Sequence, residues 1–189
     1  MKKKALILHG TDATPADNWF PRLKQKLENE GYDVWIPELP GNHAPDREVY
    51  ANFFFNSDWD FEDSIVIGHS SGAVEVLNML MDERCPEIKL AACVSAWEHG
   101  VPAGMDASQF ESLFPVNGFD FAKIKDKAER IEFIHADNDP YCPLEQAAHM
   151  ARELDAKLTV IPKGLHLSEN STKFTQLLSA IINGISKVA

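Results

Sequence analysis

Residues 65–73 read IVIGHSSGA, and this stretch decides the fold. A run of β-branched residues leads into a turn that contains two serines between glycines. The next residues, AVEVLNMLM at 73–81, are apolar on most sides of a helix. A buried strand that turns sharply into a buried helix is therefore predicted, and such a turn can expose a nucleophile at its apex.

Only one of the two serines fits that apex. A sharp strand-to-helix turn is crowded, so the residues two before and two after the apex must be small. Around Ser70 these residues are Gly68 and Gly72, which gives the pattern G-x-S-x-G, whereas Ser71 would have His69 two residues before it. Ser70 is the predicted nucleophile, and the alternative is a structural turn, because glycine-flanked serines also occur in turns by chance.

The same alternation of strand and helix extends along the whole chain. The strand candidates are apolar nearly throughout, as expected when helices cover both faces of a parallel sheet. Strands are predicted at 4–9, 33–37, 64–68, 89–95, 130–135 and 157–162, and helices near 16–30, 46–56, 71–83, 120–129, 143–154 and 168–186. Six such units in series predict one α/β domain over residues 1–189, doubly wound with right-handed crossovers.

The composition narrows the class of protein. The 189 residues carry a net charge of −11, which argues against nucleic acid or an anionic membrane surface as a partner. No apolar run approaches the roughly 20 residues that span a bilayer, and the apolar part of the opening MKKKALILHG is too short for a signal peptide. The three cysteines, odd in number and without a CxxC pair, predict reduced thiols and a cytoplasmic location.

One connection, residues 96–119, is too long for a plain loop. Loops of this length are usually functional, and this one contains several large apolar side chains. We interpret it as a small cap or pocket wall, with Trp97 as a candidate for contact with substrate. The alternative is an ordinary surface excursion with its own apolar cluster.

A serine hydroxyl needs a base to take its proton, and the base needs an acid to orient it. In chain order these groups are expected after later strands, at the carboxyl edge of the sheet. The segment HADNDPYCP follows the fifth strand, and GLHLS follows the sixth. His166, in the second of these segments, is therefore the predicted base.

Two aspartates compete for the role of the acid. Asp139 is favoured because Pro140 keeps it out of helical geometry, whereas Asp137 lies closer to the strand end and could cap the turn. The letters DNDPYC also resemble the start of a calcium loop, but Cys142 stands where that loop requires glycine. No metal and no organic cofactor are expected.

The other histidines receive less specific interpretations. His9 and His69 occupy tight-turn positions beside the predicted site, which suits structural or hydrogen-bonding roles, and His69 is also a candidate for contact with substrate. His135 is expected to be a hydrogen-bonded core residue, His43 and His149 to be solvated, and His99 to lie in the long loop near substrate.

The segment HGTDAT at 9–14 supplies the last part of the predicted site. A His-Gly pair after the first strand lets the backbone turn close to Ser70. The backbone N–H groups of Thr11 and Ser71 are then placed to bind a developing oxyanion. The same segment excludes a dinucleotide-binding fold, which would have G-x-G-x-x-G here.

With these parts in order, the chain resembles the α/β-hydrolase superfamily. More narrowly, it is similar to the small serine hydrolases related to retinoblastoma-binding protein 9 and to bacterial YdeN. The stretches that carry the resemblance are HGTDATPADNWFPRLKQKL, IPELPGN, IVIGHSSGA, DNDPYCP and GLHLS, and D-x-W-F-P within the first is more specific than the generic elbow.

The resemblance implies a compact six-stranded, mainly parallel sheet in the order 2-1-3-4-5-6, lacking the first two strands of larger relatives. It also implies Ser70, Asp139 and His166 as a catalytic triad that acts on small-molecule esters or amides without a cofactor. Retinoblastoma binding through L-x-C-x-E does not carry over, because no leucine precedes Cys85 by two residues. The alternatives are an aminopeptidase or amidase preference, or a non-catalytic protein-binding module on the same scaffold.

Overall fold

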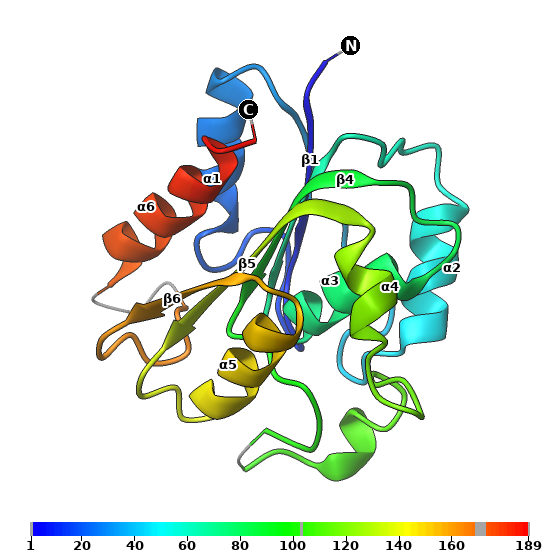
Figure 1. Ribbon diagram of the computed structural model, residues 1–189, viewed down its shortest axis with the longest axis vertical. Coiled ribbons are helices and arrows are strands. Elements are labelled where there is room, and N and C mark those ends of the chain that lie inside the picture. Colours follow the sequence, from blue (N-terminus) through cyan, green and yellow to red (C-terminus); the bar gives the residue numbers. More distant parts are fainter. Residues whose placement is uncertain (1, 103, 169–172, 189) are drawn as a thin grey trace.

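The computed structural model of the chain describes residues 2–102, 104–168 and 173–188. Their strands form one parallel six-stranded sheet in the order β2-β1-β3-β4-β5-β6 (Figure 1). The strands are β1 (Lys4–Leu8), β2 (Asp33–Trp35), β3 (Ile65–His69), β4 (Ile88–Val94), β5 (Ala128–Ala136) and β6 (Lys157–Ile161). The helices are α1 (Phe20–Asn29), α2 (Arg47–Phe55), α3 (Ser71–Met81), α4 (Phe121–Lys125), α5 (Leu144–Glu153) and α6 (Phe174–Ile185), with a short 3-10 turn η1 (Ala107–Gln109). The predicted fold class and strand order are confirmed.

Helices cover both faces of the sheet, which explains the continuous apolar strands. Figure 1 shows α1 and α6 on one side and α2 to α5 on the other. Successive side chains of a strand point to opposite faces, so Leu6 and Leu8 of β1 enter one core while Ala5 and Ile7 enter the other. Every residue of β3 is buried. The strand that carries the elbow is thus held by packing on both sides.

Close approach of α3 to the first strand depends on glycine. A Cβ built on Gly72 would lie 2.6 Å from the carbonyl oxygen of Leu8 and would also collide with that of His9. A Cβ on Gly68 would collide with the backbone of Gly72. Because neither glycine has a side chain, the start of α3 sits directly against the end of β1.

Three predicted helices differ from the observed ones by more than two residues at one end. The helix predicted at 16–30 begins at Phe20, because Asp17 accepts hydrogen bonds from the backbone and hydroxyl of Thr14 and closes a turn before it. The helix predicted at 120–129 ends at Lys125, since Ala128 already pairs with Ile88 as the start of β5. The helix predicted at 168–186 is observed from Phe174, and residues 169–172 lie outside the described part of the chain.

The 96–119 segment packs onto the core that contains α3. Trp97 stacks edge-on against Phe110 and Phe114. The side-chain oxygen of Gln146, on α5, accepts hydrogen bonds from the backbone N–H groups of residues 98 and 99. Apart from η1, the described part of the segment consists of turns and irregular structure.

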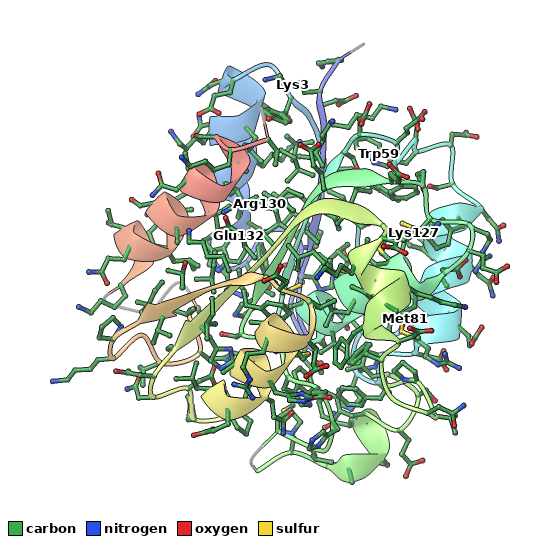
Figure 2. All side chains as sticks on the ribbon, in the orientation of Figure 1. Lys3, Trp59, Met81, Lys127, Arg130 and Glu132 are labelled. Carbon is green, nitrogen blue, oxygen red and sulfur yellow. The ribbon has the colours of Figure 1, made fainter. Side chains whose placement is uncertain are left out.

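A buried carboxylate, that of Glu132, forms an ion pair on β5, away from the carboxyl edge of the sheet. The Glu132 carboxylate accepts from Arg130 at 2.6 Å (Figure 2). The Lys157 Nζ lies 3.6 Å from the same carboxylate. Gly184 of α6 passes so close that a Cβ there would lie 2.9 Å from Glu132. The three cysteines are free and buried. Among the described residues, no helix has both the length and the apolar character needed to cross a membrane.

Candidate active site

The turn between β3 and α3 has the geometry of a nucleophile elbow. Ser70 adopts φ 57° and ψ −127°, a backbone conformation that residues other than glycine rarely adopt. Its N–H donates to the carbonyl of Val94 on the neighbouring strand, at 2.9 Å, and its own carbonyl accepts from Ala73 in the first turn of α3. Packing around the two glycines and these bonds hold a strained turn that points the hydroxyl out of the sheet edge.

His166 connects the hydroxyl of Ser70 with the carboxylate of Asp139. Its Nε2 lies 2.9 Å from the Ser70 Oγ, and its Nδ1 lies 2.9 and 3.1 Å from the two Asp139 oxygens. The carboxylate can only accept, so Nδ1 carries the proton and Nε2 is free to accept from the hydroxyl. The structure therefore brings the three residues predicted as a triad into one contact chain, from positions 96 and 27 residues apart.

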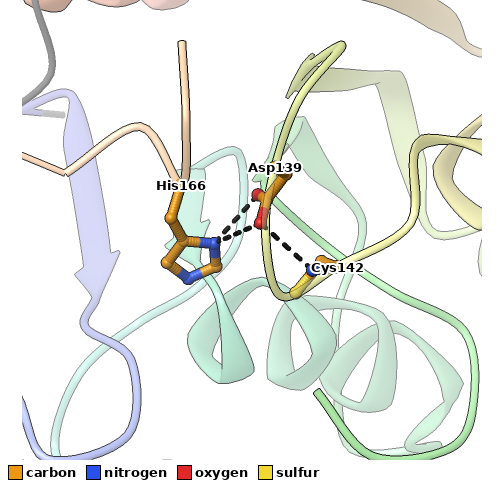
Figure 3. A group of neighbouring side chains, drawn as sticks. All are labelled: Asp139, Cys142 and His166. Carbon is orange, nitrogen blue, oxygen red and sulfur yellow. Dashed lines mark hydrogen bonds and ion pairs between the residues drawn. The ribbon is translucent and has the colours of Figure 1, made fainter. Parts of the chain in front are cut away.

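Asp139 is fixed and kept ionised by its surroundings. Figure 3 shows its carboxylate directed at the His166 ring, with a further bond from the N–H of Cys142, and the N–H of Tyr141 also donates to it. Burial opposes its charge, but the hydrogen bond and charge of His166, with the two N–H donors, outweigh burial and lower the pKa of Asp139. The competing Asp137 instead accepts from the N–H of Lys163, 2.6 Å away.

The turn after β1 approaches the elbow from the other side. A Cβ on Gly10 would lie 2.9 Å from the Ser70 Cβ, so only glycine fits there. The hydroxyl of Thr11 donates to that of Ser71 at 2.9 Å, which joins the two residues predicted to form an oxyanion hole. Ser71 is the first residue of α3, where backbone N–H groups have no acceptor within the helix.

His9 makes two hydrogen bonds at this turn, which matches the structural or hydrogen-bonding role predicted for it. Its Nε2 accepts from the N–H of Leu39, and its Nδ1–H donates to the carbonyl of Gly10, both at 3.0 Å. Burial lowers the pKa of His9, which keeps the ring neutral and able to accept.

The two residues predicted to contact substrate are both buried. Trp97 is 1% exposed and donates its indole N–H to Gly100 within its own segment. His69 is 3% exposed, and its Nε2–H donates to the backbone carbonyl of His166 at 2.8 Å. Contact with substrate stays a prediction for both and is disfavoured by this burial. Of the two roles considered for His69, the hydrogen-bonding one matches the observed contact.

Three side chains near the site were not singled out by the sequence. Tyr141 is 45% exposed, and its ring meets the His166 ring edge-on at 5.1 Å between centroids. Trp19 donates its indole N–H to the backbone carbonyl of Leu167. The Ser95 hydroxyl lies 3.4 Å from the backbone carbonyl oxygen of His166. For Trp19 the D-x-W-F-P motif was a signal, and Tyr141 lies two residues after the acid, but nothing in the sequence marks Ser95.

The remaining histidines lie in ordinary environments. Buried His135 donates Nε2–H to the carbonyl of Cys142, at 3.0 Å. Exposed His43 contacts Asp12, and half-exposed His149 contacts Glu98, each at 2.8 Å.

One group of side chains has donor atoms close enough to be compared with a metal site. The donor atoms of Asp139, Cys142 and His166 all lie within 4.8 Å of one another (Figure 3). Both ring nitrogens of His166 already face Asp139 and Ser70, and burial raises the pKa of the Cys142 thiol, which keeps it protonated. These contacts suit proton transfer better than metal coordination.

Comparison with known proteins gives matches along almost the whole chain. A family described as serine hydrolase matches residues 5–179. The hydrolase YdeN of Bacillus subtilis (strain 168) is 26% identical over 179 residues, covering 94% of this chain and 92% of YdeN. The serine hydrolase RBBP9 of Rattus norvegicus is 23% identical over 181 residues, covering 94% and 93% of the two chains.

Solved structures match in fold. The crystal structure of the ydeN gene product from B. subtilis superimposes with a TM-score of 0.80 at 22% identity, covering 97% of this chain and 99% of that one. Est1E from Butyrivibrio proteoclasticus gives a TM-score of 0.69 at 16% identity, covering 98% and 89%, and has also been solved with ferulic acid bound.

Proposed function

Because the chain belongs to the serine hydrolase family, we propose that it cleaves small esters through Ser70, His166 and Asp139. The observation that carries the proposal is the unbroken series of contacts from the Ser70 hydroxyl through the imidazole to the buried carboxylate. Such a series makes a weakly nucleophilic hydroxyl reactive at neutral pH.

The proposed reaction is a two-step acyl transfer. His166 removes the proton from Ser70 as the hydroxyl oxygen attacks the ester carbonyl, and the resulting oxyanion is held by the N–H groups of Thr11 and Ser71. The tetrahedral intermediate collapses, the carbon–oxygen bond to the leaving group breaks, and the imidazolium gives its proton to the departing alcohol. Water then attacks the acyl-enzyme by the same route and releases the acid.

Asp139 contributes by holding the proton on Nδ1 and by stabilising the imidazolium. Thr11 and Ser71 contribute their backbone dipoles, and loss of one such donor typically costs about 10²–10³ in rate. The hydrogen bond between their hydroxyls keeps the two N–H groups in a fixed relation. The site thus combines a base, an orienting acid and two oxyanion donors around one reacting hydroxyl.

The test is labelling with a fluorophosphonate probe. The wild-type protein should form one adduct, located at Ser70 by peptide mass spectrometry. Ser70→Ala should lose the adduct and hydrolysis of p-nitrophenyl esters, while Ser108→Ala, an exposed serine, should keep both. Unchanged labelling of Ser70→Ala would refute the proposal.

A panel of substrates then defines the specificity. Esters of graded acyl length, compared with aminoacyl amides, measure whether turnover follows the acyl group or the leaving group. Faster turnover of the amides would replace the esterase activity by an amidase activity of the same residues.

A further inference from the structure

The segment that carries His166 has an unfavourable backbone conformation. Leu165 and Leu167, on either side of the histidine, both have φ 53°. For residues other than glycine, such a conformation costs of order 1–3 kcal/mol and persists only where the surroundings enforce it. The position of the imidazole therefore depends on contacts outside the segment.

Those contacts come from four different parts of the chain. The indole N–H of Trp19 donates to the carbonyl of Leu167 at 3.0 Å, and the N–H of Leu165 donates to Asn138 at 2.9 Å. The shortest contact to the segment's backbone carbonyls is made by His69, whose Nε2–H lies 2.8 Å from the carbonyl oxygen of His166 itself. The Ser95 hydroxyl approaches the same oxygen at the longer distance of 3.4 Å.

We propose that His69 is a positioning residue for the reaction proposed above, holding the backbone of His166 so that its ring meets Ser70. The inference rests on the proposed function and adds a residue that acts through the base rather than on the substrate. Two adjacent residues then fix the two ends of one histidine: His69 binds its carbonyl, and Ser70 contacts its ring nitrogen.

The surroundings of His69 suit this role. Its ring is held edge-on by Trp19 and against Phe20, so the donor nitrogen has a fixed direction. Its centroid is 4.9 Å from that of the His166 ring. A charged ring at that distance would oppose formation of the imidazolium.

Neutrality of His69 is ensured by burial. Desolvation, with a smaller contribution from His166, lowers the pKa of His69 to about 3. The ring is thus uncharged at neutral pH, and the acceptor it faces requires the proton to be on Nε2. A neutral donor orients the base without competing with it for charge.

The proposal is tested with three substitutions at one position. His69→Gln places an amide N–H near the original Nε2, whereas His69→Asn is shorter and His69→Phe has no donor. His69→Phe and His69→Asn should lower kcat by about 10- to 100-fold with little change in KM, as expected when a catalytic group is displaced without loss of binding. His69→Gln should keep most of the wild-type kcat.

Fluorophosphonate labelling separates positioning from folding. The final stoichiometry counts folded sites, and the labelling rate per site reports how well the base activates Ser70. His69→Phe and His69→Asn should label slowly to normal stoichiometry. Phe54→Leu, in the core on α2 and away from the site, is the matched control and should label at the wild-type rate even if its stability is lower.

Each outcome decides the question. Wild-type rates per site in both His69→Phe and His69→Asn, or failure of His69→Gln to restore kcat, would overturn the positioning role. If His69→Phe does not fold, the comparison of His69→Asn with His69→Gln decides alone. Absence of labelling in the wild-type protein would instead contradict the proposed function.

Discussion

At the scale of single residues, two carboxylates two positions apart do different work. Asp139 faces the His166 ring with a fully buried side chain, whereas Asp137 accepts one bond from the backbone of Lys163. Both follow the same strand, and both are compatible with a turn. What separates them is the direction of the side chain, which Pro140 and the N–H groups of the next two residues determine.

The two aspartates therefore provide a matched pair of variants. Asp139→Asn should lower kcat by up to about 10⁴-fold, because an amide favours the wrong tautomer of the histidine. Asp137→Asn keeps an oxygen for the N–H of Lys163 and should keep most of the activity. Steady-state ester hydrolysis by both variants measures the difference. Equal losses of kcat in the two variants would mean that the substitutions act by disturbing the loop conformation and not by removing the acid.

The sequence was sufficient to predict the residues of the contact chain. It was not sufficient to predict the residues that donate hydrogen bonds to the backbone around His166. Ser70 and Asp139 could be predicted because local chemistry, glycine spacing in one case and the following proline in the other, restricts their positions. The donors from His69, Trp19 and Ser95 depend on the conformation after β6, where two leucines have positive φ. No local preference of leucine predicts that conformation, since tertiary contacts enforce it.

At the scale of elements, the elbow works because α3 can approach β1 without side chains between them. Gly72→Ala would place a methyl group against backbone carbonyls that cannot move aside. We expect a loss of about 3 kcal/mol or more in the free energy of unfolding, at the upper end for overpacking. Urea denaturation measures the loss, and activity should fall because the turn carries Ser70 and the proposed oxyanion donor Ser71.

Gly118→Ala is the control for this substitution. Gly118 has φ +76° but no heavy atom within 4 Å of a built Cβ, so only the backbone preference is lost, about 1–2 kcal/mol. A smaller effect at position 72 than at position 118 would contradict the packing argument.

The types of the elements followed from periodicity, whereas their ends did not. Residues 126–129 continue a helical pattern, but the chain at Ala128 is already paired with Ile88. Hydrogen bonding to a distant strand overrides local preference there, and the sequence has no local signal of it. Trp97 of the 96–119 segment is part of the core, so its contact with substrate is disfavoured, while the interpretation of the segment as a pocket wall stays a prediction.

At the scale of the whole molecule, buried histidines connect stability with pH. The pKa of His69 is about 3 in the folded protein against an ordinary value of 6.5, so between these values the unfolded chain binds a proton that the folded chain does not. The contribution of His69 to the free energy of unfolding is therefore largest above about pH 6.5. It falls on acidification, by up to about 1.4 kcal/mol per pH unit for one proton. Burial lowers the pKa values of His9 and His135 in the same direction.

Urea denaturation at a series of pH values tests this linkage. His69→Phe should show a shallower dependence than the wild type between about pH 6 and 4, whatever its stability at pH 7. Asp139 acts in a lower window: its lowered pKa contributes stability that is lost only as the pH falls below its ordinary value of about 3.8. Parallel curves for the two proteins would rule out a neutral His69 in the folded state.

The strand order also has a consequence for synthesis. The Ser70 hydroxyl and the proposed oxyanion turn follow two of the inner strands, β3 and β1, whereas the His166 imidazole follows β6, which lies at the edge of the sheet. A polypeptide emerging from the ribosome, N-terminus first, could complete the elbow while the proposed general base, His166, is still inside the exit tunnel. Reactivity toward the probe would then appear only when the last strand docks. Acylation by the probe would therefore report completed folding, and Ser70 of an incomplete chain would remain unreactive.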